Sequence, residues 1–361
     1  RFESAAAWSG GAAGGGVVSI CEKEKRESEM KKLGCMLMAV LMAVAVSGCS
    51  DKKEASENKE TEKKVTLILD YLPNTNHTGF YVAKEKGFFK EEGLDVDIIE
   101  PGDDSTSATL VAANKGEFGV SYQEDVTYAR TAEEPLPIRA IATIIQHNTS
   151  GFVSLKKENI KSPKDFEGKV YAGWQAPSEE AVVKAVMTAA KADFSKLTMV
   201  GADGSGFASL GKSVDIQWEF EGWAVTKGRM EGYDLNYIPL RELDERLDYY
   251  TPVIITSEKM IKEDPETVQK FMNAVKKGYE YAIEHPDAAA EILSKYAPDY
   301  DLKFLKESQK YLSSEYARDA DSWGVMKDSV WDNYTAFMYE NKLITEKIKA
   351  DEQYTNEFVT K

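Results

Sequence analysis

The chain has 361 residues, of which 42% are hydrophobic, and a formal net charge of −16 at pH 7. A chain of this length buries enough apolar surface for two ordinary domains. Its acidity disfavours nucleic acid and anionic lipid as partners, so no nucleic-acid function is expected. Because the three cysteines are Cys21, Cys35 and Cys49, residues 50–361 are predicted to lack disulfides, cysteine nucleophiles and thiolate metal sites.

An export signal precedes the part of the chain that is expected to fold. Two lysines follow Met30, an apolar run covers 33–46, and a Ser-Gly-Cys triplet ends at Cys49. The apolar run is too short for a mature membrane-spanning helix, and the small residues before the cysteine admit a peptidase. We therefore predict a lipoprotein signal peptide at 30–48, lipidation of Cys49, and attachment to the extracytoplasmic face of a bacterial cell membrane. An ordinary cleaved secretory signal is the alternative.

The residues on either side of this signal are not expected to pack. Residues 1–29 hold Gly-Ala repeats and a mixed charged run, and Met30 has the character of a start residue. We interpret 1–29 as upstream sequence translated by mistake. Residues 49–64 are rich in Lys, Glu, Ser and Asn, which predicts a flexible tether.

From residue 65 onward, short β-branched runs alternate with helical stretches, which is typical of an α/β fold with a mostly parallel sheet. The first set has predicted strands at 65–70, 94–100, 118–122 and 138–145, and helices at 77–86, 105–114 and 124–131. A second set follows residue 151, with strands at 169–173, 198–200, 215–219 and 236–238, and helices at 178–191 and 222–230.

The pattern then returns to long helices. A strand at 252–257 precedes predicted helices at 265–284, 286–296, 302–313 and 322–339. We predict two α/β lobes joined by two crossings, near 147–151 and 247–252, with a ligand cleft between the lobes. The first lobe would hold 65–148 and 252–345, the second 149–251, and a C-terminal tail 346–361.

The segment after the first predicted strand carries the clearest binding signal. It reads Asp-Tyr-Leu-Pro-Asn-Thr-Asn-His-Thr-Gly at 70–79. Ligands of open α/β sheets bind beyond the carboxyl ends of the strands, and free amides at a helix start suit a carbonyl, a ring nitrogen or an anion. Asn74 and Asn76 can cap such a helix, so a well-capped helix start without a ligand is the alternative.

Further motifs follow in order. They are Val-Ala-Lys-Glu-Lys-Gly-Phe-Phe at 82–89, Ser-Tyr-Gln-Glu-Asp at 121–125, Gln-His-Asn-Thr-Ser-Gly at 146–151 and Glu-Phe-Glu-Gly-Trp at 219–223. Together with 70–79, these pieces resemble the thiamine-pyrimidine precursor-binding proteins of ABC importers. The resemblance implies a type II periplasmic-binding-protein fold that closes on a small aromatic heterocycle, an aminopyrimidine, and delivers it to a permease with a cytoplasmic ATPase. A monomer without catalytic activity, cofactor or metal is expected.

Flat and acidic side chains near the predicted strand ends are the candidates for ligand contact. A planar ring gains burial and stacking between Tyr or Trp faces, although large aromatic residues also fill ordinary cores. Carboxylates suit the donor edge of an aminopyrimidine, although Glu221 also has a favourable helix-dipole position. The predicted ligand-binding residues are Asp70, Tyr71, Asn74, Asn76, His77, Tyr122, Gln123, Glu124, Asn148, Trp174, Glu219, Glu221, Trp223 and Tyr250.

Two patterns suggest other chemistry and are rejected. Residues 206–213 match the phosphate-loop pattern, but a strand-like run follows where that loop needs a helix, so a short helix stopped by Gly211 is predicted. The three histidines, at positions 77, 147 and 285, lack metal-ligand spacing.

Two other functions stay open. The family resembles the fungal pyrimidine synthase of thiamine biosynthesis, which uses an active-site histidine and a cysteine-rich iron-binding segment. His77 lies in the equivalent motif, but 248–251 holds no cysteine where that segment should fall. The other possibility is a receptor for riboflavin or for an alkanesulfonate such as taurine. No Arg or Lys lies between Asp70 and Val82 to bind a sulfonate, although backbone amides alone can bind one.

Overall fold

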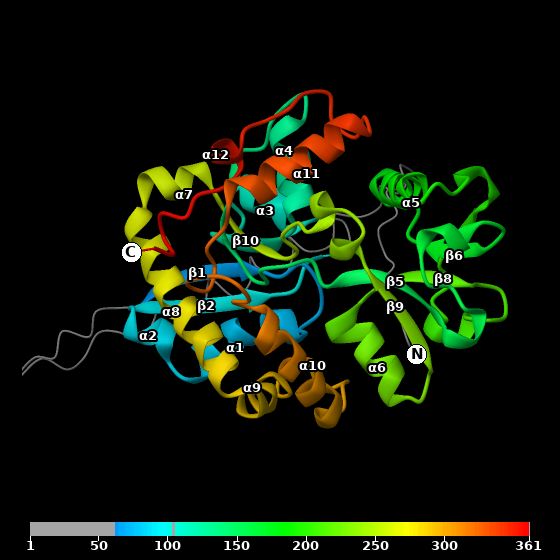
Figure 1. The fold of residues 1–361 in the computed structure, drawn as a ribbon. Helices are drawn as coiled ribbons and strands as arrows, with labels where there is room; N and C mark the ends of the chain where they lie inside the picture. The colour runs from blue at the N-terminus through cyan, green and yellow to red at the C-terminus, as the bar shows by residue number, and fades with distance from the viewer. Residues whose placement is uncertain (1–61, 103–104, 361) are drawn as a thin grey trace, which may run out of the picture. The chain divides into compact units, whose positions relative to one another are not determined.

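Two five-stranded sheets organise residues 62–102 and 105–360, which are the residues that this computed structural model describes (Figure 1). The predicted signal peptide and Cys49 lie outside them. The first sheet has the strand order β2-β1-β3-β10-β4, and the second has the order β7-β6-β8-β5-β9. The strands of the first sheet are β1 (Lys63–Ile68), β2 (Leu94–Ile99), β3 (Phe118–Ser121), β4 (Ile138–Thr143) and β10 (Val253–Ser257). Those of the second are β5 (Ser150–Leu155), β6 (Val170–Gly173), β7 (Thr198–Gly201), β8 (Ile216–Phe220) and β9 (Leu235–Pro239).

The prediction of mostly parallel sheets is only half right. Strand β1 pairs in parallel with β2 and β3, and β6 pairs in parallel with β7 and β8. Strands β10 and β5 are antiparallel to both of their neighbours. Each of these two is the first strand after the chain passes from one sheet to the other. Such a strand enters at the edge where the parallel strands end, so it runs in the opposite direction. Strand β5 was not predicted; its first two residues lie in the predicted crossing at 147–151, and the rest were assigned to no element.

The helices follow the predicted order, with changes at their ends. The 20-residue helix α8 has the predicted bounds, whereas α11 begins six residues later than predicted, and α2, α7 and α12 were not predicted. The helices are α1 (Thr78–Glu85), α2 (Phe88–Glu91), α3 (Ser107–Ala112), α4 (Gln123–Thr131), α5 (Pro177–Ala189), α6 (Thr226–Met230), α7 (Glu258–Glu263), α8 (Pro265–Glu284), α9 (Pro286–Leu293), α10 (Leu302–Glu315), α11 (Asp328–Glu340) and α12 (Ala350–Gln353).

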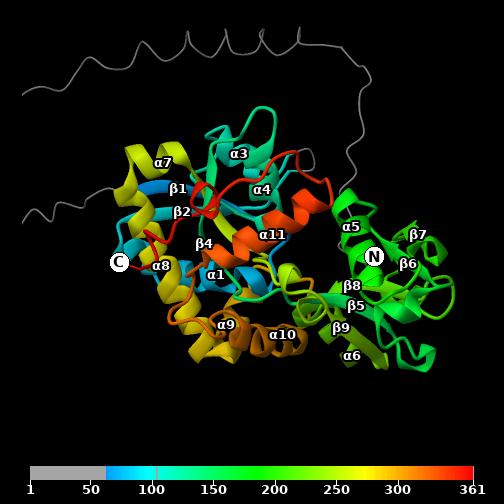
Figure 2. The ribbon, with the colours of Figure 1, turned by 45° about the horizontal axis from the view of Figure 1, so that its top comes forward.

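We call the second sheet with α5 and α6 the second lobe, and the first sheet with the other helices the first lobe. The last residues also pack on the first lobe, since Tyr354 forms a bridge with Ala140 of β4, and Phe358 and Val359 are buried. Figures 1 and 2 both show α10 beside α6, and α11 extending toward α5. Tyr334 and Phe337 of α11 belong to a hydrophobic cluster of the second lobe. Two first-lobe helices therefore contact the second lobe.

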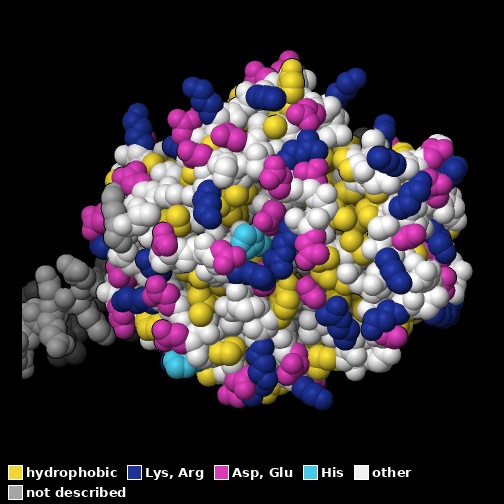
Figure 3. Space-filling view, viewed as in Figure 1, with side chains coloured by type: hydrophobic (Ala, Val, Ile, Leu, Met, Phe, Trp, Pro, Cys, Tyr) yellow, Lys and Arg dark blue, Asp and Glu magenta, His cyan; other side chains and the backbone are white. Residues whose placement is uncertain are grey.

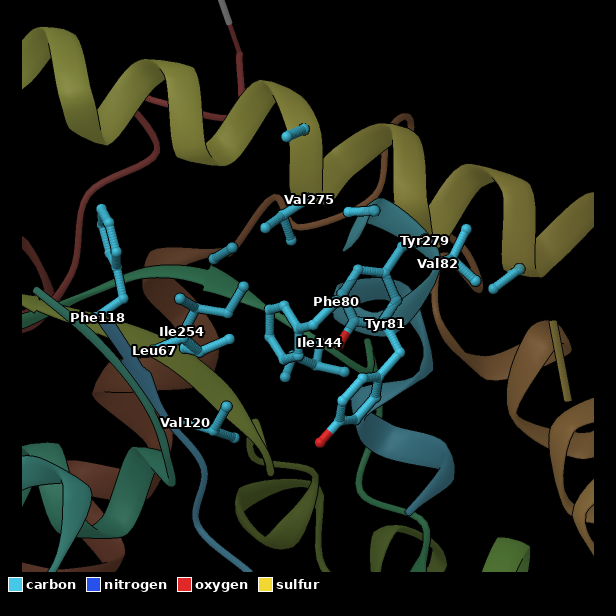
Figure 4. Close-up of a cluster of buried hydrophobic side chains, with 14 of the residues drawn as sticks. Leu67, Phe80, Tyr81, Val82, Phe118, Val120, Ile144, Ile254, Val275 and Tyr279 are labelled. Carbon is cyan, nitrogen blue, oxygen red and sulfur yellow. The ribbon is translucent and has the colours of Figure 1, made fainter. Parts of the chain in front are cut away.

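The core of the first lobe lies between its sheet and α8 (Figure 4). Helix α8 begins with Asp264 as an N-cap and Pro265 at its first position, both favoured at helix starts. Its buried face stacks Phe271 on Phe118 of β3, with ring centroids 3.8 Å apart. Helices α1 and α8 cross at two glycines. A Cβ atom on Gly278 would lie 2.0 Å from the Gly79 carbonyl oxygen, so only glycine permits this approach of the two backbones.

Charged side chains of both signs are interspersed over the face shown in Figure 3. Among the described residues, surface charges form pairs such as Lys196 with Glu167 at 2.9 Å and Lys277 with Glu91 at 3.0 Å. Exposed pairs of this kind contribute little stability. On this face, the negative net charge is not gathered into one acidic surface.

Replacement of Gly278 by alanine should destabilise the first lobe. Alanine favours a helix over glycine by about 1 kcal/mol, but overpacking against a backbone atom costs about 1–3 kcal/mol. We expect the clash to dominate and denaturant unfolding to show a lower free energy of unfolding. Replacement of exposed Glu280 in the same helix by alanine is the control, with a change within about 0.5 kcal/mol. A Gly278→Ala variant as stable as the wild type would show that α1 and α8 separate at little cost.

Candidate functional site

The 70–79 motif follows β1 at the edge of the first sheet where β1 and β3 end. Asn74 caps a short 3-10 helix (Thr75–His77), because its Oδ1 accepts from the Asn76 N–H at 2.9 Å. Helix α1 starts directly afterwards. The sequence thus predicted the cap correctly, and the structure adds that its function is to orient His77.

His77 is completely buried, and both of its ring nitrogens have partners. Its Nδ1 accepts from the Asn74 N–H at 3.3 Å, and its Nε2 lies 2.6 Å from Oδ1 of Asp70. A nitrogen that accepts carries no proton, so the hydrogen bonds assign the proton to Nε2, which donates it to the carboxylate. His77 therefore fixes the orientation of the Asp70 carboxylate, and neither of its ring nitrogens is free to bind a ligand.

Asp70 joins this network to Tyr122. The Tyr122 hydroxyl donates to Oδ2 of Asp70 at 2.7 Å. Burial raises the pKa of Asp70, but the neighbouring His77 and the hydrogen bonds from His77 and Tyr122 lower it by more, so the net pKa lies below its ordinary value. Burial and the Asp70 charge raise the pKa of Tyr122 well above normal. Asp70 is therefore ionised, Tyr122 keeps its proton, and the hydroxyl oxygen of Tyr122 can act only as an acceptor toward another group.

Two more carboxyl groups lie beside this pair, in the first turn of α4. Burial, with a contribution from Glu124, raises the pKa of Asp125 to about 7. Burial also raises the pKa of Glu124, whose Oε2 accepts from the Tyr334 hydroxyl at 2.9 Å. Glu124 also forms a hydrogen bond with Ser178 of the second lobe. Asp125 was not among the predicted ligand-binding residues, although it ends the 121–125 motif.

The second lobe contributes a pocket at the ends of β6 and β8. Two predicted residues, Trp174 and Glu219, line it together. The Trp174 ring lies against Trp218, with centroids 5.0 Å apart and planes at 55°. Burial raises the pKa of Glu219 to about 7, and its carboxyl group forms no hydrogen bond or ion pair with the described residues. The lining residues are Ala172, Gly173, Trp174, Ala202, Asp203, Gly206, Gln217, Trp218, Glu219 and Phe220.

The segment that matches the phosphate-loop pattern has a different local structure. It begins with a 3-10 helix (Gly206–Ser209), turns at Gly211, and leads into β8. No helix follows it, as the sequence context predicted. Gly206 instead forms part of the pocket wall.

Three of the predicted ligand-binding residues fasten the two crossings and do not line the pocket. Oε1 of Gln123 accepts from the Tyr250 N–H at 2.8 Å. The Asn148 side chain donates to the Leu247 carbonyl at 2.8 Å and thereby joins the first crossing to the second. The Tyr250 hydroxyl accepts from the Lys327 N–H at 2.9 Å. All three side chains are buried, so they stabilise the two crossings in this conformation.

Glu221 and Trp223 lie where the second lobe meets α10. Glu221 pairs with Arg229 at 3.1 Å and accepts from the Tyr311 hydroxyl of α10 at 3.1 Å. The Trp223 ring packs between Tyr300 and Phe304, with each centroid distance 4.8 Å. Both residues therefore hold the lobes together outside the pocket.

Tyr71 and Asn76 are half-buried beside the first-lobe network. The backbone carbonyl of Asn76 accepts from the Tyr279 hydroxyl at 2.6 Å. Within residues 62–102 and 105–360, no group of three or more His, Cys, Asp or Glu side chains is arranged to hold a metal ion. In the same part of the chain, no helix is both long and apolar enough to cross a bilayer.

Comparison with solved structures defines the class of fold. The periplasmic aliphatic sulphonate-binding protein SsuA of Escherichia coli has a TM-score of 0.62 to this chain at 10% identity, over 81% of this chain and 91% of that one. This likeness concerns the fold alone. The chain has the two-lobed α/β fold of the periplasmic binding proteins.

The family follows from the sequence match. The family model described as NMT1/THI5 like matches residues 74–289, so the chain belongs to the NMT1/THI5-like family. The match covers the 70–79 motif from Asn74 onward, both crossings, all of the second lobe and the first half of α9.

Named relatives of the chain include both binding proteins and an enzyme. The formylaminopyrimidine-binding protein of Halalkalibacterium halodurans is 25% identical over 89% of this chain and 98% of its own length. The 4-amino-5-hydroxymethyl-2-methylpyrimidine phosphate synthase of Legionella pneumophila is 21% identical over 82% and 93%. The riboflavin-binding protein RibY of Chloroflexus aurantiacus is 22% identical over 91% and 99%.

The proton of His77 should be found on Nε2. Nitrogen-15 chemical shifts of the ring distinguish the two neutral tautomers, and the buried ring should show the Nε2–H tautomer. The exposed ring of His285 is the internal control, because averaging between tautomers is expected there. A proton on Nδ1 of His77 would contradict the assigned direction of the hydrogen bond to Asp70.

Glu219 should reduce stability as the pH rises. Its pKa increases from an ordinary 4.5 to about 7 on folding, so between these values the folded chain binds more protons than the unfolded chain, and stability falls with rising pH. Replacement by glutamine should remove this loss, stabilising the protein at pH 8 by about 3 kcal/mol relative to its effect at pH 4. Denaturant unfolding at both pH values measures the change, with exposed Glu231→Gln as control. Equal effects at the two pH values would contradict the raised pKa.

Proposed function

We propose that this protein is the extracytoplasmic substrate-binding component of an ABC importer, and that it captures a thiamine pyrimidine precursor of the formylaminopyrimidine or hydroxymethylpyrimidine type. The observation that carries this proposal is the pocket in which the Trp174 ring and the unpaired Glu219 carboxyl group lie together. An aromatic face beside a polar group without a protein partner suits a flat nitrogen heterocycle. The similarity to a formylaminopyrimidine-binding protein supports the same ligand class.

The first lobe would provide the other half of the site. Asp70 and Tyr122 both present oxygen acceptors, because the Tyr122 hydroxyl already donates its proton in the hydrogen bond to Asp70. An exocyclic amino group is a donor, so it matches this edge, while Glu219 with its raised pKa suits the ring nitrogen. The ligand would bridge the lobes and favour a closed state, with the crossings around Asn148 and Tyr250 absorbing the rotation.

The network around His77 supports binding in preference to catalysis. His77 is buried with both nitrogens engaged, so it is not placed to react as in a histidine-dependent synthase. Residues 50–361 also contain no cysteine. The carboxylates beside Tyr122 argue against a sulfonate as ligand, because like charges repel. Riboflavin shares the stacking chemistry and is therefore included as a competing ligand in the tests.

The remaining parts of the proposal concern the location and assembly of the protein. Lipidation at Cys49 after cleavage of 30–48, with a tether from 49 up to the start of β1 at Lys63, would hold a monomer at the extracytoplasmic membrane face. The first and second lobes, as the two sheets define them, would close on the ligand and dock on the permease. The cytoplasmic ATPase would then drive transfer.

A pair of pyrimidines tests the proposed ligand class. Calorimetry should show binding of 4-amino-5-hydroxymethyl-2-methylpyrimidine, and at least about tenfold weaker binding of its 4-oxo counterpart, because the oxo group places an acceptor against acceptors. Trp174→Ala should weaken binding by a similar factor through lost stacking, whereas Tyr339→Ala, an exposed aromatic residue on α11, should have no effect. Binding of riboflavin or taurine without binding of either pyrimidine would refute the ligand class. Formation of a chemical product would refute the receptor function.

A further inference from the structure

Trp174 lies in a loop whose conformation is not favoured by its own sequence. The loop connects β6 to α5, and the next residue, Gln175, has a φ of +62°, in the left-handed region that non-glycine residues adopt at a cost. Such a backbone persists only where surrounding contacts stabilise it. The orientation of the Trp174 indole in the pocket therefore depends on whatever holds this loop.

Glu179 makes those contacts. It is the third residue of α5, and its side chain is 1% exposed. Its Oε1 accepts from the Trp174 N–H at 3.2 Å, and its Oε2 accepts from the Gln175 N–H at 2.6 Å. It also accepts from the N–H of Ala176, the N-cap residue. A glutamate at this position often reaches back to the N-cap amide; here the same carboxyl group binds three consecutive amides.

Two neighbouring residues restrict the position of the carboxyl group. The Tyr171 hydroxyl of β6 donates to Oε1 at 2.6 Å. On the other side lies Gly173, where an added Cβ atom would be 1.7 Å from Oε1. The glycine at 173 therefore leaves the space that the Glu179 carboxyl group occupies. This arrangement links β6, the Trp174 loop and the first turn of α5 through one buried carboxyl group.

We infer that Glu179 is a positioning residue for ligand binding: it holds the Trp174 loop so that the indole lies in the pocket at a fixed angle to Trp218. Glu179 does not line the pocket and acts through Trp174. Its importance for affinity rests on the proposed role of Trp174 as the stacking surface. Its importance for the geometry of the two indoles does not depend on any ligand.

The indole pair gives a readout that needs no ligand. Two indoles with centroids 5.0 Å apart and planes at 55° couple electronically, which produces paired bands of opposite sign in far-ultraviolet circular dichroism. A Trp174→Phe variant defines the spectrum without this coupling. We expect Glu179→Gln to lose most of the coupled signal, because glutamine has one acceptor oxygen where the glutamate has two, and its amide nitrogen cannot accept from the loop.

Affinity for 4-amino-5-hydroxymethyl-2-methylpyrimidine gives the second readout. Calorimetry on the full chain should show about tenfold weaker binding for Glu179→Gln. The matched control is Glu180→Gln, the next residue of the helix, which is exposed and should leave both the coupled signal and the affinity unchanged. If the wild type binds no pyrimidine, the ligand proposal fails, while the dichroism still decides the role of Glu179.

A second variant displaces the carboxyl group without removing it. Gly173→Ala places a methyl group against Oε1, and the flexible end of Glu179 should move away from the loop. The coupled signal should fall as in Glu179→Gln, and this variant decides the question if Glu179→Gln does not fold. A folded variant of either kind that retains both the coupled signal and wild-type affinity would overturn the inference.

Discussion

The fold of the candidate site depends on carboxyl groups that are buried and therefore require hydrogen-bond donors. A buried carboxylate without partners is strongly unfavourable, so each such group constrains the residues around it. Asp70 at the end of β1 takes donors from His77 and Tyr122. Glu179 at the start of α5 takes them from Tyr171 and from the loop that carries Trp174. In both lobes, one acidic side chain thus connects the end of a strand to a helix start and to an aromatic residue of the candidate site.

This arrangement explains why the two lobes present different surfaces to a ligand. In the first lobe, the Tyr122 hydroxyl already donates its proton in a hydrogen bond to Asp70. Only acceptor oxygens therefore remain for a ligand. In the second, Glu219 has no protein partner and a pKa raised to about 7 by burial, so it can accept or donate near neutral pH. A ligand held between them needs a donor on one edge, a ring nitrogen on another and a flat face for Trp174. Aminopyrimidines combine these features, which is the physical basis of the proposed ligand class.

The network around His77 supports the proposed binding function over that of a histidine-dependent enzyme. The chemistry of the 70–79 motif depends on what its side chains touch. His77 donates through Nε2 and accepts through Nδ1, so its role is to fix the orientation of Asp70. Because the relatives include both a binding protein and a synthase, similarity alone does not decide the function.

Local patterns in the sequence determined much of the secondary structure and lobe organisation of this protein. The alternation of short β-branched runs with helical stretches indicated two α/β lobes, and the cap at Asn74 and the bounds of α8 were predicted from nearby residues. Strand β5 was missed, because it begins inside the predicted crossing.

Only the tertiary structure decided which candidate residues meet. Trp174 and Glu219 line one pocket, whereas Gln123, Asn148 and Tyr250 fasten the crossings and Trp223 packs on α10. The residues that bury and hydrogen-bond one another come from distant segments, as Gln123 and Tyr250 do. Contacts of this kind leave no periodic pattern in the sequence. For the same reason Glu179 and Asp125 resembled ordinary surface acids in the sequence, and their roles follow only from the groups packed around them.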